Sequence, residues 1–207
     1  IGRIFVILIL LSLFILISAI SYVDAVSNNI ADSVFRLHVI ANSDSKEDQE
    51  LKLKVRDELL LYMNIISKDS TSKQEAMQIA NEHKEEFTQI AEKVIKENGY
   101  NYTVNVQIGK ADFPTKYYGD ITLPAGTYDA LKVQIGEAKG QNWWCVMFPP
   151  LCFVDVSTGI VPDNSKQELK QSLDDEEYDL ISKTDNNEIS FKFKIVELFQ
   201  NWRLGNK

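Results

Sequence analysis

The strongest constraint on this chain is an uninterrupted apolar run near its N-terminus. Residues Ile4–Val23 contain no charged side chain, follow Arg3 and end at Asp24. A helix that packs against a soluble core needs a polar face, and this run offers none. A basic residue followed by a long apolar stretch is typical of an export signal or a membrane anchor.

Two fates are open for this N-terminal segment. Val23 and Ala25 have the residue spacing that signal peptidase prefers, so cleavage after Ala25 would release the rest of the chain. Without cleavage, residues 4–23 are nearly long enough to span a bilayer and would hold the protein at a membrane. Because residue 1 is Ile rather than Met, we also expect the natural start to lie further upstream.

Composition places the rest of the chain among ordinary globular domains. Apolar residues make up 44% and charged residues 25% of the 207 residues, which excludes a disordered or collagen-like chain. We divide the chain into a signal peptide or anchor at 1–25, a linker at 26–33 and one exported signalling domain at 34–207. The net charge of −8 stays with the exported domain, because residues 1–25 carry one Arg and one Asp. Since such a domain repels polyphosphate, nucleic acid is not an expected partner.

Hydrophobic periodicity predicts an α/β domain of the α+β type, with two helices packed on a mostly antiparallel sheet. Apolar positions three or four apart predict the helices from about Lys46 to Ile66 and from about Ser72 to Asn98. Alternating and β-branched residues predict strands at 34–40, 102–108, 117–123, 128–135, 143–148 and 151–156, of which those in the middle of the chain form a meander. An acidic helix is expected within 164–180, and a strand followed by a short helix within 189–202.

The two cysteines, Cys145 and Cys152, flank a segment that contains Pro149 and Pro150, which favour a turn. Outside the cytoplasm an even pair is a candidate disulfide, and two strands on either side of the turn would bring the sulfurs together. The alternative is a pair of buried free thiols that pack as small hydrophobic side chains. Zinc would need further ligands, and the two histidines are far away in sequence, so no metal site is expected.

The usual catalytic motifs are missing from the sequence. It contains no phosphate-binding loop, no nucleophile elbow and no H-E-x-x-H pair. The segment 155–159 only faintly resembles an aspartic-protease loop, since Val156 separates Asp155 from Ser157. We therefore expect neither catalytic residues nor a cofactor.

The most enzyme-like segment is the loop after the first predicted strand. It gathers oxygen-bearing side chains where α/β sheets often bind ligands, and these are suited to Ca²⁺ or Mg²⁺. The residues are Asn42, Ser43, Asp44, Ser45 and Asp48. The same residue types form turns and cap helices, so the alternative is a purely structural loop. An exported hydrolase or metal-dependent enzyme that uses the Asn42–Asp48 loop is therefore the alternative function.

Two adjacent tryptophans suggest a surface for a protein partner. Neighbouring residues of a strand point to opposite faces, so one of Trp143 and Trp144 would enter the core while the other faces outward. An exposed tryptophan on a rigid strand is a good interface anchor, although both side chains can also be buried. The histidine of the first strand can likewise be purely structural. The predicted partner-binding set is Trp143, Trp144, Arg36, His38, Asn42 and Asp44.

Two unusual blocks distinguish this chain from a generic α/β domain. The first is RLHVIANSDS at residues 36–45, which is followed by KEDQ. The second consists of LPAGTY at 123–128 and IGEAKGQNWWCVMFPPLCFVD at 135–155. Over about residues 34–200 the chain resembles the stage II sporulation protein R family, and the exported members of that family share its apolar N-terminus.

This resemblance implies a signalling protein of endospore-forming bacteria, secreted from the forespore into the space between the forespore and mother-cell membranes. There it would activate a membrane-embedded aspartic protease, which processes the inactive precursor of a mother-cell sigma factor. The chain is then an activator and not an enzyme, and the receptor-protease is its partner. Residues 4–23 would contact the membrane before cleavage or without it. The resemblance supplies no active-site residues, so the predicted site residues rest on this sequence alone.

Overall fold

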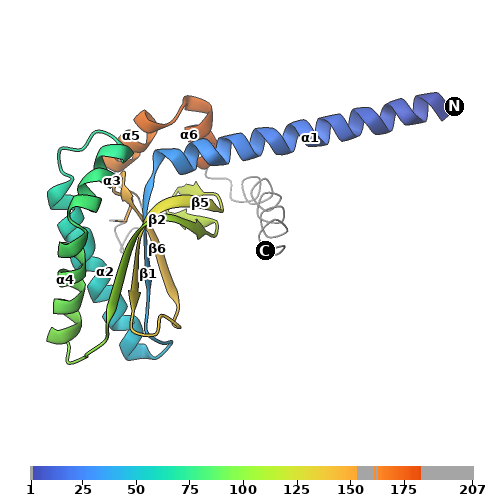
Figure 1. The fold of residues 1–207 in the computed structure, drawn as a ribbon. Coiled ribbons are helices and arrows are strands. Elements are labelled where there is room, and N and C mark those ends of the chain that lie inside the picture. The colour runs from blue at the N-terminus through green and yellow to red at the C-terminus, as the bar shows by residue number, and fades with distance from the viewer. Residues whose placement is uncertain (1, 153–160, 162, 183–207) are drawn as a thin grey trace.

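The computed structural model describes residues 2–152, 161 and 163–182 (Figure 1). Its helices are α1 (Gly2–Ser33), α2 (Lys46–Ile66), α3 (Lys73–Glu82), α4 (Lys84–Glu97), α5 (Asp163–Ser172) and α6 (Asp175–Ser182). Its strands are β1 (Phe35–Ile40), β2 (Val104–Phe113), β3 (Lys116–Tyr118), β4 (Ile121–Leu123), β5 (Gly126–Ile135) and β6 (Asn142–Phe148). The elements predicted within 189–202, and most of the strand predicted at 151–156, lie outside the described residues.

The main sheet has the strand order β2-β5-β1-β6. Strand β5 pairs antiparallel with β2, and β6 pairs antiparallel with β1, whereas β1 and β5 run parallel. The α+β class and the mostly antiparallel sheet are therefore confirmed. The predicted meander is wrong, because β1 inserts between β5 and β6. All six residues of β1 are buried, as expected for a central strand, but periodicity alone does not reveal its neighbours.

Helices α2, α3 and α4 lie together on one side of the sheet (Figure 1). Ser45 and Ser72 cap α2 and α3, because each hydroxyl accepts a hydrogen bond of 3.2 Å from a backbone N–H in the first turn. Helix α2 has the predicted bounds, whereas the second predicted helix is divided at His83 into α3 and α4. The Tyr62 hydroxyl of α2 lies 2.8 Å from His83 Nδ1, a tertiary contact that a continuous apolar stripe does not reveal.

The apolar N-terminal run lies in α1, which projects away from the sheet (Figure 1). Its large apolar side chains between Ile4 and Ile17 are exposed. Among the helices that the described residues form, none combines the length and the apolar character needed to cross a membrane.

The last turns of α1 differ from the linker predicted at 26–33. These residues are helical, and Val26, Ile30 and Ala31 are buried in the hydrophobic core. The Lys73 ammonium of α3 donates a hydrogen bond of 3.0 Å to the Ala31 carbonyl and lies 2.6 Å from the Asp129 carboxylate of β5. The end of α1 is therefore part of the folded domain.

Residues 117–123 form a small hairpin instead of one strand. Strands β3 and β4 pair antiparallel across a turn at Gly119, whose φ of 59° is readily available to glycine. The acidic helix predicted within 164–180 is likewise divided, into α5 and α6. The Asp174 side chain caps α6 by accepting a hydrogen bond of 2.7 Å from the Glu177 N–H.

Candidate functional site

A cleft of about 1040 Å³ lies along β6, the strand at one edge of the sheet. One wall is a face of α2, and the other is the β3–β4 hairpin together with the segment that follows β6. The lining residues are Gln49, Lys52, Leu53, Arg56, Asp57, Leu60, 116–119, 141–145, Leu151 and Cys152. The volume lies just above the range usual for small-molecule pockets.

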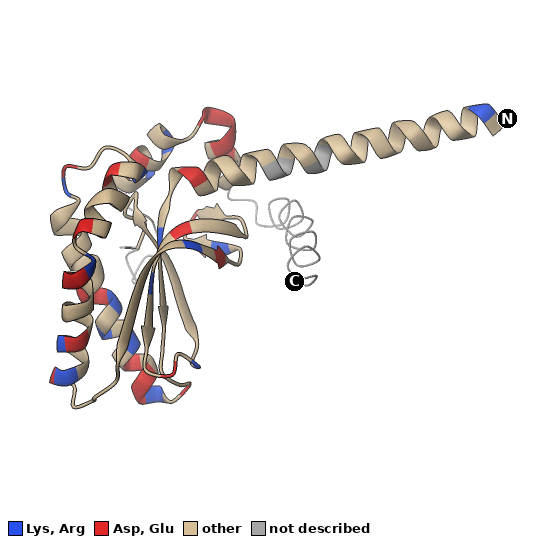
Figure 2. Ribbon diagram, in the orientation of Figure 1, with Lys and Arg blue, Asp and Glu red and all other residues tan. Residues whose placement is uncertain are grey.

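The cleft is positively charged although the whole chain carries −8. Acidic and basic residues are interleaved along α2 and α4, whereas α6 carries four acidic residues and no basic one (Figure 2). The charged residues that line the cleft are Lys52, Arg56, Lys116 and a single acid, Asp57. The cleft therefore differs in sign from the molecule as a whole.

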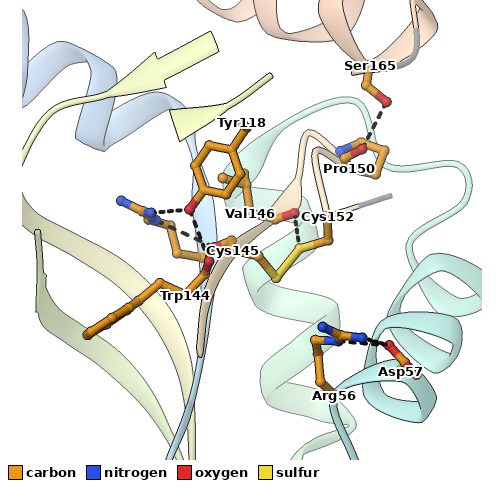
Figure 3. Close-up of a disulfide and its surroundings, with 10 residues drawn as sticks. Arg56, Asp57, Tyr118, Trp144, Cys145, Val146, Pro150, Cys152 and Ser165 are labelled. Atoms are coloured by element: carbon orange, nitrogen blue, oxygen red, sulfur yellow. Dashed lines mark hydrogen bonds and ion pairs between the residues drawn. A yellow bond between two sulfur atoms is a disulfide. The ribbon is translucent and has the colours of Figure 1, made fainter. Parts of the chain in front are cut away.

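Trp143 lies against the α2 wall. The Arg56 guanidinium lies 4.1 Å from the centre of the indole ring, a cation–π distance. Arg56 also forms an ion pair of 2.6 Å with the exposed Asp57 carboxylate (Figure 3). Because the planar guanidinium can stack and donate hydrogen bonds at once, Arg56 keeps donors for a further acceptor.

Trp144 lies on the opposite face of the sheet. Its indole stacks on the His38 imidazole, with ring centres 5.6 Å apart, and the Lys116 ammonium lies 4.2 Å from its centre. The two tryptophans thus point to opposite faces, and both are half-buried. Neither indole N–H has an acceptor among the described residues.

Burial lowers the pKa of Lys52 and of Lys116, because each ammonium is partly removed from water. Arg56 lowers the pKa of Lys52 further, and Arg36 has the same effect on Lys116. The Lys52 ammonium donates to the Gln49 side-chain oxygen at 2.6 Å and to the Gln141 carbonyl at 2.9 Å, both of which are neutral acceptors. A nearby anion would therefore stabilise the charged form of both lysines.

Cys145 and Cys152, which both line the cleft, form a disulfide (Figure 3). Their Cα atoms are 5.4 Å apart, within the range that a disulfide bridges. The loop between them is tied to α5 by the Ser165 hydroxyl, which donates to the Pro150 carbonyl at 2.9 Å. The disulfide therefore joins the edge strand to the segment that leads into α5.

Arg36 is fully buried behind this cleft and does not reach the surface. Its guanidinium lies 4.0 Å from the centre of the Phe113 ring and donates to the Tyr118 hydroxyl at 2.6 Å. Tyr118 in turn donates to the Trp144 carbonyl at 3.2 Å (Figure 3). The prediction that Arg36 contacts a partner is therefore wrong, because the residue has no exposed surface. Arg36 instead supports the β3–β4 hairpin, which lines the cleft.

His38 is the other member of the predicted set on β1, and it is nearly buried. Its Nε2 lies 2.7 Å from the Asn142 side-chain oxygen. Burial lowers the pKa of His38, although the hydrogen bond with Asn142 opposes this effect. His38 is therefore neutral at neutral pH and holds Trp144 in place.

Asn42 and Asp44 join two loops at the end of the sheet. Asn42 donates to Asp48 at 2.8 Å and accepts from the Glu137 N–H at 3.0 Å, and Asp44 accepts from the Gln141 N–H at 2.7 Å. Burial raises the pKa of Asp48, but hydrogen bonds from Ser43 and Asn42 outweigh it, so the net direction is downward.

This arrangement does not support the alternative function as a metal-dependent enzyme. That function requires the Asp44 and Asp48 side chains to be free for a ligand, whereas both already accept hydrogen bonds within the protein. Within the described part of the chain, no group of three or more His, Cys, Asp or Glu side chains is placed to hold a metal ion.

Comparison with known proteins identifies the family. The profile described as "Stage II sporulation protein R (spore_II_R)" matches residues 31–158, which is more than half of the chain. The chain belongs to the stage II sporulation protein R family. It is also 39% identical over 152 residues to the stage II sporulation protein R of Bacillus subtilis (strain 168), covering 70% of this chain and 68% of that protein. No solved structure matches it.

The region that matches the sporulation family contains the whole cleft. It begins within the last turns of α1 and extends past the disulfide. It excludes the apolar run and helices α5 and α6, so the family resemblance coincides with the sheet and the helices packed on it. Membership of this family connects the chain with sporulation.

Sequence reasoning found the tryptophans of this sporulation protein but missed the cations beside them. Lys52 and Arg56 are four residues apart on a predicted helix, a spacing that places them on one face and predicts one wall. Lys116 had no such signal, because it reaches Trp144 only when the β3–β4 hairpin folds against β6.

Proposed function

We propose that this protein is an exported intercellular signal that activates a membrane-embedded aspartic protease of the mother cell. The protease would then process the precursor of a mother-cell sigma factor during sporulation. Membership of the stage II sporulation protein R family carries this proposal. The positively charged, tryptophan-lined cleft supports it, because rigid aromatic and arginine side chains are the usual anchors of protein interfaces.

Export belongs to the same proposal. Residues 1–25 would direct the chain from the forespore into the space between the two membranes, with cleavage after Ala25. Among the side chains of α1 that the structure describes, Val26 is the first that is buried in the core, so we expect this cleavage to leave the folded domain whole. If the segment is retained instead, residues 4–23 would keep the signal at the membrane from which it is exported.

Within this proposal the protein acts as a ligand and not as an enzyme. A ligand activates its receptor by binding, so the effect should saturate when the protein and the receptor-protease are present in equal amounts. An enzyme would turn over and would act at a small fraction of that ratio. Titration therefore separates the two roles.

The test is reconstitution of the full chain with the receptor-protease in membrane vesicles and with the sigma-factor precursor. We expect cleavage of the precursor only when all three are present, with saturation near a one-to-one ratio. Equal cleavage without this chain, or full activation by trace amounts of it, would contradict the proposal. The Asp44→Ala/Asp48→Ala double variant, compared as folded protein, tests the alternative of an enzyme that uses the Asn42–Asp48 loop.

A further inference from the structure

The cleft along β6 has a positively charged wall on each side of the strand. Lys52 and Arg56 come from α2, and Lys116 comes from the β3–β4 hairpin. Among the described residues, Lys52 is bonded only to neutral oxygens and Lys116 lies over an indole ring. Charge complementarity therefore favours an acidic occupant.

The shape of the cleft follows the edge strand. The Lys52 ammonium contacts the Gln141 carbonyl, and four residues further along α2 the Arg56 guanidinium covers Trp143. Four helical residues advance about 6 Å, and the two strand residues from 141 to 143 advance about 7 Å. Helix and strand thus run side by side, and the lining residues 141–145 extend over about 13 Å. This length fits four or five residues of an extended peptide.

An extended segment beside β6 would meet both walls. Successive side chains of a strand point to opposite faces, so alternate side chains would be directed at α2 and at the hairpin. Trp143 and Trp144 already show this alternation, with Arg56 over the first and Lys116 over the second. The Tyr118 hydroxyl already donates a hydrogen bond to the Trp144 carbonyl, so a bound segment could not pair with every backbone group of β6. Side chains would therefore contribute more to recognition than backbone hydrogen bonds.

We propose that this cleft binds an extended acidic segment of the protein partner, with carboxylates directed at Arg56 and Lys116. The segment would lie along the edge of the sheet, as in other complexes where a peptide is bound beside an edge strand. This inference rests on the proposed function only for the identity of the partner. The cleft itself recognises negative charge in an extended chain.

The probe is fluorescein-labelled decaglutamate, titrated by fluorescence anisotropy against the full chain in non-ionic detergent. We expect decaglutamate to bind, and decalysine and a neutral Gly–Ser decapeptide not to bind. Arg56→Glu and Lys116→Glu should each weaken binding by about tenfold or more, because a charge-assisted contact is replaced by repulsion. Lys93→Glu is the matched control on α4, and it should leave binding unchanged within about twofold because Lys93 is exposed and outside the cleft.

Folding is checked for each variant by circular dichroism, and Arg56→Gln and Lys116→Gln replace any variant that fails to fold. Equal binding by the cleft variants and the Lys93 control, or no binding of decaglutamate, would overturn the proposal. If the wild type formed a dimer that the cleft variants lost, the occupant of the cleft would be a second copy of this chain, and the proposal would be overturned. Reconstitution separates the two proposals. If Lys116→Glu still activates the protease fully, the cleft inference fails while the proposed function stands. If the wild type binds decaglutamate but does not activate the protease, the proposed function fails while the cleft inference stands.

Discussion

Arg36 shows how a single residue can organise one side of the cleft. Its guanidinium is fully buried, and its Nη1 has no hydrogen-bond partner among the described residues. Aromatic rings and the Tyr118 hydroxyl surround it, so within the described part of the chain its positive charge is compensated only by cation–π contacts and neutral acceptors. Such a charge is costly to bury, and its retention is explained by the position that it gives to Tyr118.

Two substitutions of Arg36 separate its volume from its charge. Arg36→Ala should lower the free energy of unfolding by about 3 kcal/mol, because it leaves a cavity beside Phe113 and Tyr128. Arg36→Met should cost less than about 1 kcal/mol, because it fills the space and removes an incompletely compensated cation. Urea unfolding measures both changes, and equal losses in the two variants would contradict this account.

His38 predicts how stability depends on pH. Its pKa lies below the ordinary value of 6.5 in the folded protein, so the unfolded chain binds a proton more readily. The contribution of neutral His38 is complete above pH 6.5 and is lost as the pH falls through the lowered folded pKa. Asp48 and Asp129 have lowered pKa values and remain ionised in this window.

We therefore expect the urea midpoint of the wild type to fall between pH 7.5 and pH 5.5. His38→Gln, which keeps a hydrogen-bonding group near Asn142, should reduce this fall. His83→Gln is the matched control, because its imidazole lies between α2 and α4 and not against Trp144. A fall of the same size in wild type and His38→Gln would show that other groups control the pH dependence.

At the scale of elements, the joint between the β1–α2 loop and the β5–β6 loop fixes one end of the cleft. The backbone N–H groups of Lys139 and Gly140 donate to the carbonyls of Asn42 and Ala41, at 3.1 and 3.0 Å. A Cβ atom at Gly140 would overlap the Ser43 carbonyl, so the two loops approach this closely only because that residue is glycine.

Gly140→Ala should therefore lower the free energy of unfolding by about 2 kcal/mol or more, since backbone atoms have to move apart. Gly109→Ala on β2 is the matched control, because a Cβ atom there has no neighbour within 4 Å. It should change stability by less than about 0.5 kcal/mol. Chemical denaturation compares the two, and an equally mild effect at Gly140 would mean that the loops are not tightly joined.

Local patterns predicted the elements of this fold better than they predicted its pairings. The serine cap and apolar stripe of α2 involve neighbours in sequence, so its bounds were predictable. The parallel pairing of β1 with β5 depends on residues about ninety positions apart, such as Leu37 and Leu131, and periodicity carries no such information. The same reason explains why Trp143 was predicted as a contact residue and Lys116 was not.

At the scale of the whole molecule, the disulfide connects the edge strand β6 with the segment that follows it, which a hydrogen bond from Ser165 joins to α5. It closes a short loop, since Cys145 and Cys152 are seven positions apart. The chain-entropy relation gives about 2.5 kcal/mol for a loop of this size. Cys145→Ser/Cys152→Ser should lose about that much stability in urea, and reductant should have the same effect on the wild type. A wild type whose stability does not respond to reductant would contradict a stabilising bridge.

The N-terminal helix divides at Ala25 into a part that the domain does not need and a part that it does. The large apolar side chains between Ile4 and Ile17 are exposed and bury little surface, whereas Val26, Ile30 and Ala31 belong to the core. A chain that begins at Val26 should therefore unfold at the same urea midpoint as the full chain. A chain that begins at Val34 should lose more than about 4 kcal/mol, because two large buried side chains and a small one are removed together. That loss approaches the total stability of an ordinary domain, so this shorter chain should be largely unfolded by circular dichroism. If it remained folded with an unchanged midpoint, residues 26–33 would be a linker as the sequence predicts, and the boundary of the exported domain would move from Val26 to Val34.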